Sequence, residues 1–316
     1  MAQAQQPSQA KSYGSFTPTM AINLAAPHTW PAAILPVAVA VACAAATGAT
    51  VSASMSCILL AICILMQSSV NTFNDYYDYV KGTDSTDDDV DPSDAVLLYN
   101  NVNPRSALAL AIGLLVAAFL LGGYVIWQTG IIPLIIGIIG AIFVVLYSAG
   151  KTPISYLPLG EAVSGIVMGG LIPLACYYVL AGDLTPFALL WAIPEILGVG
   201  LIMFTNNTCD IEKDIEAKRH TLSVVLGRKK ARSLYHGILW TWIIAIIILV
   251  AVFFTKGCIA LPFMVLSAYP LLKALLSNPL APQSRQAAMS QVCGVNIALG
   301  AWYAAAIFAS NALVVW

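Results

Sequence analysis

The chain has 316 residues, of which 59% are hydrophobic and only 9% are charged, and its mean hydropathy is +0.84. Because soluble domains are typically about a quarter charged, this composition excludes an ordinary water-soluble globule. The formal net charge of -1 includes no basic excess, which argues against nucleic acid or an anionic membrane surface as the main partner. We therefore expect a membrane protein whose partners are small molecules and lipid.

Residues 1–20 are rich in Gln, Ser, Thr and Ala and predict a mobile N-terminal tail. Residues 21–316 are expected to form one transmembrane domain, because apolar runs near the length of about 20 residues that a bilayer core requires follow one another along them. Nine such runs predict an all-α membrane protein with nine transmembrane helices: 29–48, 52–79, 105–127, 130–148, 159–181, 186–208, 233–255, 258–276 and 287–314.

Positive charge falls on one side of this arrangement. If the N-terminus is cytoplasmic, 13 of the 14 Lys and Arg residues lie in cytoplasmic segments and only Lys256 lies outside. Positively charged loops favour the cytoplasmic face, and a wrong helix count would scramble the segregation. The pattern therefore predicts a multi-pass protein of the cytoplasmic membrane with a cytoplasmic N-terminus.

Cysteine and histidine give little indication of a metal centre. The seven cysteines are scattered, mostly through apolar runs, with no Cys-x-x-Cys pair, and are interpreted as small apolar packing residues. The three histidines, His28, His220 and His236, share no ligand spacing. A zinc or haem site is therefore not expected.

Acidic residues gather in two clusters, at positions 75–94 and 210–216, which together hold 12 of the 15 Asp and Glu residues. With a cytoplasmic N-terminus and nine spans, both clusters fall on the cytoplasmic side, at the ends of two expected helices. They are expected to converge over one cavity. Residues 87–94 are interpreted as solvated loop. Asp75 and Asp78 instead continue an apolar helix. Because a carboxylate costs roughly 2.5 kcal/mol or more toward the bilayer centre, their presence there indicates a function.

The spacing within the clusters favours Mg²⁺. Asn74 and Asp78 are four residues apart and share a helix face, and Asn206, Asp210 and Asp214 repeat that spacing. Mg²⁺ prefers oxygen ligands and is usually held by one or two carboxylates plus phosphate oxygens of a substrate. Each motif therefore predicts ligands for one ion, and a diphosphate that bridges two ions becomes a better leaving group.

At these residues the sequence resembles the UbiA superfamily of intramembrane prenyltransferases, and the agreement spans nearly the whole chain. Three motifs carry it in order: Asn-Asp-x-x-Asp at Asn74, Asp75 and Asp78; Tyr-x-x-x-Lys at Tyr147 and Lys151; and Asn-Asn-x-x-Asp-x-x-x-Asp at Asn206, Asn207, Asp210 and Asp214, followed by Thr221 and Leu222. The resemblance implies a single nine-helix bundle that transfers a polyprenyl group from its diphosphate to an aromatic acceptor, with Mg²⁺ as cofactor.

The resemblance also implies residue roles. The catalytic set is Asp75, Asp78, Tyr147, Lys151, Asp210 and Asp214. The Mg²⁺ ligands are Asn74, Asp78, Asp84, Asp210 and Asp214, with Asp84 as the third acid of the first motif. The substrate-binding set is Lys81, Arg105, Tyr156, Asn206, Asn207 and Arg219, where Lys151 would contact the diphosphate and Tyr147 and Tyr156 would face the allylic cation.

Within the family, the sequence looks closest to the branch that prenylates 1,4-dihydroxy-2-naphthoate on the way to menaquinone. Three stretches carry this likeness: Lys81-Gly82-x-Asp84, Pro153-Ile154-Ser155-Tyr156 with Gly160-Glu161, and the segment that begins at Pro27-His28-Thr29. The chain departs from the family at Ala26 and Cys209, where relatives have Arg, and at Lys218 and His220. These departures leave open which basic residues contact the diphosphate.

Two other functions remain open from the residues. A family member acting on another acceptor, such as hydroxybenzoate, haem, a chlorophyllide or a glyceryl phosphate, would carry the same motifs. An ion-coupled transporter would also hold carboxylates in its helices. Transporter sites tend to lie near the membrane midplane on interrupted helices, whereas both acidic clusters here are expected at one face.

Overall fold

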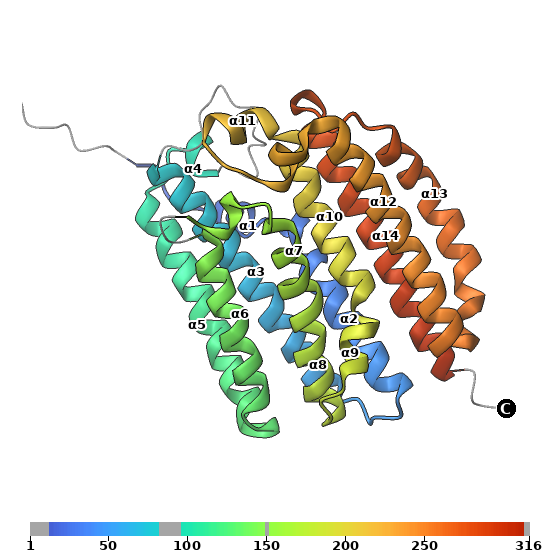
Figure 1. Cartoon of the computed structure of the whole chain (residues 1–316). Coiled ribbons are helices and arrows are strands. Elements are labelled where there is room, and N and C mark those ends of the chain that lie inside the picture. The colour runs from blue at the N-terminus through green and yellow to red at the C-terminus, as the bar shows by residue number, and fades with distance from the viewer. Residues whose placement is uncertain (1–12, 82–95, 149–151, 313–316) are drawn as a thin grey trace, which may run out of the picture. The chain divides into compact units, whose positions relative to one another are not determined.

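The computed structural model describes residues 13–81, 96–148 and 152–312, and within these ranges the chain is helical without strands (Figure 1). The side chains of Asp78 and Lys81 lie outside this description. The main elements are α1 (Pro18–Ala25), α2 (Pro31–Ala46), α3 (Ala53–Lys81), α4 (Val96–Tyr99), α5 (Pro104–Thr129), α6 (Ile132–Ser148), η2 (Ile154–Tyr156), α7 (Gly160–Ser164), η3 (Gly165–Leu171), α8 (Ile172–Ala181), α9 (Pro186–Trp191), α10 (Ile193–Cys209), α11 (Ile211–Glu216), α12 (Leu222–Phe253), η4 (Thr255–Ala260), α13 (Leu261–Ser277), η5 (Pro282–Ser284) and α14 (Arg285–Ala312).

The chain divides into two compact units, residues 1–27 with 68–115 and residues 28–67 with 116–316. The first unit has a small core of Leu24, Val96, Leu97, Val102 and Ala107. Hydroxyl groups on α3 bond to carbonyls of neighbouring segments in this unit: Thr72 Oγ1 donates to Leu24 O at 3.1 Å and Ser69 Oγ donates to Ala111 O at 2.8 Å. These bonds fix α3 to α1 and α5 where the first acidic motif begins.

The second unit is built around α10, which packs against α12, α14 and the π-helix η3. Figure 1 shows α10, α12 and α14, coloured yellow to red, running side by side. Their shared core contains large buried side chains, among them Phe204, Tyr235, Trp242 and Tyr303. Burial of these rings holds α10 in place, and α10 carries the second acidic motif at its C-terminal end.

Two glycines allow η3 to approach α10 closely. A Cβ on Gly165 would lie 2.5 Å from the carbonyl oxygen of Ile196, and a Cβ on Gly169 would lie 2.5 Å from the backbone carbonyl of Glu195. Small residues at such contacts let membrane helices pack backbone to backbone. The π-helical turn, a form that often occurs at functional sites, follows directly after Glu161 and α7.

Each of the nine expected spans coincides with described helix, but not all of these helices are long and apolar enough to cross a membrane alone. Six meet that criterion: Ala53–Tyr77, Pro104–Thr129, Gly160–Ala181, Leu222–Phe253, Thr255–Ser277 and Pro282–Ser310. A pair bent by 57°, Pro18–Thr29 with Pro31–Ala46, would be a seventh, and α6 contains only the shorter apolar segment Ile132–Phe143. The multi-pass membrane character is confirmed, while the count of nine and the orientation stay predictions.

The remaining expected span, 186–208, is divided by a break at Ala192 between α9 and α10. In the expected tail, residues 1–12 lie outside the described ranges, and α1 begins at Pro18. Large apolar side chains on the outer helix faces are strongly exposed, for example Trp127 at 78% and Leu120 at 72%. Exposed apolar surface of this kind fits contact with lipid.

Candidate active site

The first acidic motif lies on α3 in the first unit. Asn74 is exposed, whereas Asp75 is buried and its carboxylate accepts hydrogen bonds from Val96 N at 2.6 Å and Leu97 N at 3.2 Å. A side-chain oxygen that accepts from the first N–H groups of a helix stabilises that helix start. Asp75 therefore anchors α4 within its own unit, and its catalytic role stays a prediction.

The other expected residues of this unit are less fully described. Asp78 and Lys81 belong to α3 by backbone, and Asp84 lies outside the described residues. Arg105 is exposed in the first turn of α5, where its backbone N–H donates to Asn103 Oδ1 at 3.0 Å. The roles proposed for these residues remain predictions.

The second acidic motif forms the turn between α10 and α11 in the second unit. Helical hydrogen bonding continues through the turn, since Asp210 N donates to Asn206 O at 3.0 Å and Asp214 N donates to Asp210 O at 2.9 Å. The i, i+4 relation expected from the spacing is thus kept from Asn206 to Asp214. Arg228 supports the turn by donating to the carbonyls of Thr208 at 3.2 Å and Cys209 at 3.3 Å.

Arg285, the first residue of α14, contacts this motif directly. Its Nη2 donates to Asn206 Oδ1 at 2.6 Å, and its Nε lies 3.1 Å from the Asp210 carboxylate. Reasoning from the sequence missed this contact and counted Arg285 only as a cytoplasmic charge. The family resemblance indicates that Cys209 stands in place of an arginine, but it does not indicate which residue takes that place. The guanidinium of Arg285 arrives from 75 residues further along the chain.

Asp214 is almost fully buried and held on two sides. Thr221 Oγ1 donates to its Oδ2 at 3.1 Å, and Arg219 Nη1 lies 3.5 Å from its Oδ1. Burial raises the pKa of Asp214 above its ordinary value, and the neighbouring Arg219 guanidinium opposes that rise. The Arg219 guanidinium also lies 4.9 Å from the centroid of the Tyr156 ring. The structure thus brings Asp214, Arg219 and Tyr156 together, as the sequence predicts for a site.

A second buried pair joins α10 to the start of α7. Asn207 Nδ2 donates to Glu161 Oε1 at 2.8 Å, and both residues are buried. The hydroxyl of Tyr147, near the end of α6, lies 3.5 Å from the position that a Cβ on Gly160 would take. Tyr147 and Asn207, both expected at the site, therefore meet around Glu161. Lys151 lies outside the described residues.

The second motif offers the oxygen donors that Mg²⁺ prefers. They are the amide oxygen of Asn206 and the carboxylates of Asp210 and Asp214, and the Asp210 side chain is 18% exposed. Within the described ranges, no group of three His, Cys, Asp or Glu side chains is placed to hold an ion by itself. Mg²⁺ in proteins usually takes several of its ligands from water or a substrate phosphate, and this set of oxygen donors fits such an ion.

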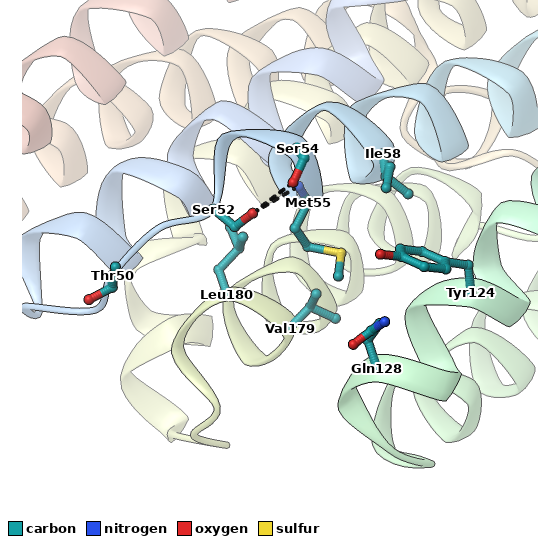
Figure 2. Close-up of a pocket in the computed structure, with 9 residues that line it drawn as sticks. All are labelled: Thr50, Ser52, Ser54, Met55, Ile58, Tyr124, Gln128, Val179 and Leu180. Atoms are coloured by element: carbon teal, nitrogen blue, oxygen red, sulfur yellow. Dashed lines mark hydrogen bonds between the residues drawn. The ribbon is translucent and has the colours of Figure 1, made fainter.

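A cavity of about 300 Å³ lies elsewhere in the second unit (Figure 2). It is lined by the start of α3, the end of α5 and the end of α8, with Ser52, Tyr124 and Gln128 among its polar residues. Its nine lining residues include no charged group. Because Leu180 and Glu161 lie at opposite ends of one long helix, this cavity is separate from the cluster around Glu161.

Comparisons with known proteins identify relatives of this chain. The model of the UbiA prenyltransferase family matches residues 33–292. A 1,4-dihydroxy-2-naphthoate octaprenyltransferase from Bacillus subtilis (strain 168) is 32% identical over 193 residues, which cover 60% of this chain and 61% of that protein. The match therefore spans less than two thirds of that relative's length.

Solved structures share the fold. The apo structure of a UbiA homolog from Aeropyrum pernix K1 has a TM-score of 0.64 at 15% identity, covering 85% of this chain and 96% of that chain. A UbiA homolog from Archaeoglobus fulgidus bound to GPP and Mg²⁺ has a TM-score of 0.62 at 15% identity, covering 93% and 99%. At these identities the structures establish a common fold and nothing further.

Proposed function

Because the chain belongs to the UbiA prenyltransferase family, we propose that it transfers a polyprenyl group from polyprenyl diphosphate to 1,4-dihydroxy-2-naphthoate, a step of menaquinone biosynthesis, and releases diphosphate. The observation that carries the proposal is the polar turn at the end of α10. Asn206, Asp210 and Asp214 lie there on successive helical turns, and Asp214 pairs with Arg219, whose guanidinium lies over the Tyr156 ring. The name of the Bacillus subtilis relative supports the acceptor, and the neighbour bound to GPP and Mg²⁺ supports the donor and the ion.

In this proposal Mg²⁺ neutralises the diphosphate and so makes it a better leaving group. Asp210 and Asp214 would hold one ion, and Asn74, Asp78 and Asp84 of the first motif would hold the other. In the described structure Arg285 bonds to Asn206 and Asp210, so it keeps both side chains oriented until metal and diphosphate arrive.

Basic and aromatic residues complete the site. Lys81, Arg105, Lys151 and Arg219 bind the phosphate oxygens, since cations placed where negative charge develops stabilise the departing diphosphate. Tyr147 and Tyr156 face the allylic cation, which an aromatic ring attracts through its π electrons. Asn207 orients a carboxylate of the same cluster.

The placement in the cell is part of the proposal. We place the protein in the cytoplasmic membrane with its N-terminus and its active site facing the cytoplasm, because positive loops favour that side. The polyprenyl tail enters laterally from lipid and lies along apolar helix surface, so its head group reaches the helix ends where the charged residues lie.

A product assay tests the proposal. Membranes containing the protein are incubated with one polyprenyl diphosphate, Mg²⁺ and either 1,4-dihydroxy-2-naphthoate or 4-hydroxybenzoate, and the lipid product is identified by mass. We expect prenylated naphthol that has lost CO₂. Product from hydroxybenzoate alone would reassign the acceptor.

The same assay separates an enzyme from a transporter. Purified protein in detergent cannot sustain a gradient, so turnover there, abolished by EDTA and restored by Mg²⁺, is expected only of an enzyme. If detergent-solubilised protein forms no prenylated product from an aromatic hydroxy acid, haem, a chlorophyllide or a glyceryl phosphate, the proposal that it is a prenyltransferase is wrong.

A further inference from the structure

Among the described residues, one carboxylate oxygen of Glu161 has a hydrogen-bond partner and the other has none. Oε1 accepts the hydrogen bond from Asn207 Nδ2 at 2.8 Å. Oε2 is buried and has no hydrogen-bond partner among the described residues. A structural link between α7 and α10 accounts for Oε1, but it gives no reason to bury Oε2 unpaired, which is unfavourable and rare in native structures.

The surroundings of Glu161 locate that unused oxygen at the proposed active site. Asn207 follows Asn206, the residue that Arg285 contacts, so the partner of Glu161 belongs to the second acidic motif. The hydroxyl of Tyr147 lies beside Gly160, the residue before Glu161. The polar groups that meet here come from α6, α7 and α10.

The backbone holds Glu161 firmly in this position. A Cβ on Gly200 would lie 3.4 Å from the Glu161 carbonyl oxygen, and a Cβ on Gly165 would overlap the Ile196 carbonyl. This close approach of α7 and η3 to α10 lets a short amide on α10 reach the carboxyl group. An oriented carboxyl with one free oxygen has the geometry of a general base.

Resting on the proposed function, we infer that Glu161 is a catalytic residue that takes the hydroxyl proton of the aromatic acceptor at Oε2 and later returns it. Removing the proton places electron density on the ring carbon that attacks. That carbon forms a bond to the allylic carbon of the donor, and the bond from the allylic carbon to the diphosphate oxygen breaks with its electron pair.

The bond changes after the attack need no further reactant. After attack, the ring carbon carries both the prenyl group and the carboxylate, and the former hydroxyl is a ketone. Loss of CO₂ returns the electron pair of the broken carbon–carbon bond to the ring, which becomes an aromatic oxyanion. Glu161 gives its proton back to that oxygen, so the net products are prenylated naphthol, CO₂ and diphosphate.

The chain offers a matched control for Glu161. Glu195 is also buried, and its Oε1 also lacks a described hydrogen-bond partner. It lies on α10 twelve residues before Asn207, which is about 18 Å along the helix axis. Its Oε1 lies 3.4 Å from the position of a Cβ on Gly300, in the contact between α10 and α14. A general effect of removing a buried carboxyl group would therefore appear at both positions.

The experiment compares Glu161→Gln and Glu195→Gln with the wild type in detergent. We expect Glu161→Gln to lower kcat by about 100-fold or more, in the range of general-base catalysis, with less than about a threefold change in Kd for prenyl diphosphate or acceptor. Glu195→Gln should keep kcat within about twofold. Ring-halogenated acceptors with more acidic hydroxyls should recover part of the rate in Glu161→Gln, because they need the base less.

Three results would overturn the inference: wild-type kcat in Glu161→Gln, weaker substrate binding with unchanged kcat, or equal rate losses in both variants. If Glu161→Gln does not fold, the wild type is assayed with an acceptor methylated at the hydroxyl, which has no proton to give. Binding of that acceptor with at least a 100-fold rate loss is expected, and normal turnover refutes the role. A wild type that prenylates no aromatic hydroxy acid removes the proposed function itself.

Discussion

Replacing Arg285 with methionine tests the contact that joins α14 to the second acidic motif. The substitution keeps a long side chain but removes hydrogen bonds to Asn206 Oδ1 at 2.6 Å and to the Asp210 carboxylate at 3.1 Å. Hydrogen bonds to charged groups contribute about 1.5–3 kcal/mol each when well buried. The side chains of Arg285 and Asp210 are 21% and 18% exposed, so solvent reduces this contribution.

We expect a net destabilisation of about 2 kcal/mol in Mg²⁺-free protein, between the values for surface pairs and for broken buried pairs. For a chain of 316 residues that corresponds to a fall in Tm of roughly 3 °C. Thermal unfolding in detergent, followed by intrinsic fluorescence, measures it. Lys273→Met removes an exposed cation at the end of α13 and should change Tm by less than about 1 °C, as is usual for surface substitutions.

A second measurement uses Mg²⁺, because an ion held by Asp210 as proposed would compete with Arg285 for the same oxygens. In Arg285→Met the ion binds Asp210 without displacing a guanidinium, so added Mg²⁺ should raise Tm more in the variant than in the wild type. An unchanged Tm in Mg²⁺-free protein would show that the contact contributes nothing to stability. An equal Mg²⁺ response in both proteins would show that Arg285 does not compete with the ion.

Three further predictions concern neighbouring residues. Asp214→Asn should abolish transfer in Mg²⁺-saturated protein while Tm stays within a few degrees, and unchanged turnover would remove Asp214 from the mechanism. The hydrogen bonds from Arg228 lower the pKa of Glu212. The pair therefore stabilises the fold above the ordinary pKa of glutamate, and this stabilisation is lost as pH falls through the lowered pKa. Glu212→Gln should remove this pH dependence of the free energy of unfolding, by no more than about 1 kcal/mol because the group is exposed. Gly169→Ala should lower the free energy of unfolding by about 1–3 kcal/mol through overpacking against α10. The control Gly123→Ala, with nothing within 4 Å of the new Cβ, should not lower it. Equal unfolding temperatures of the two variants would contradict the close contact at Gly169.

The positions of the helices could be read from the sequence because long apolar runs have few alternatives in a bilayer. The run expected at 105–127 is α5, Pro104–Thr129, and the run expected at 159–181 is the continuous helical stretch Gly160–Ala181. The break at Ala192 and the π-helical turn at Gly165–Leu171 could not be predicted in this way. The π-helical turn lies where Gly165 and Gly169 pack against the backbone of α10, a contact that hydropathy does not record. The break at Ala192 directly precedes α10, whose first turn contains Pro194.

The candidate site was predictable where its residues are neighbours in the sequence. Spacing placed Asn206, Asp210 and Asp214 together, and the structure keeps them on successive helical turns. Contacts over long sequence separations were not predictable, such as Arg285 with Asp210 and Asn207 with Glu161, separated by 75 and 46 residues. They depend on the order in which α7, α10 and α14 pack, and no local pattern contains that order.

The location of the polar groups at helix ends suits the proposed donor, which has a charged diphosphate head and an apolar polyprenyl tail. Glu161 lies in the first turn of α7, Arg285 begins α14, and Asp210 follows the last residue of α10, so these charged residues are at helix ends. A charge in mid-helix would lie in hydrocarbon and be strongly unfavourable, whereas at a helix end it can meet a water-borne acceptor and a diphosphate. A polyprenyl tail needs the reverse, a long apolar surface, and exposed residues such as Ile138 and Ile142 on α6 provide one. The proposed reaction between a lipid-bound tail and a polar ring would therefore occur at this boundary, where Glu161 lies in the first turn of α7.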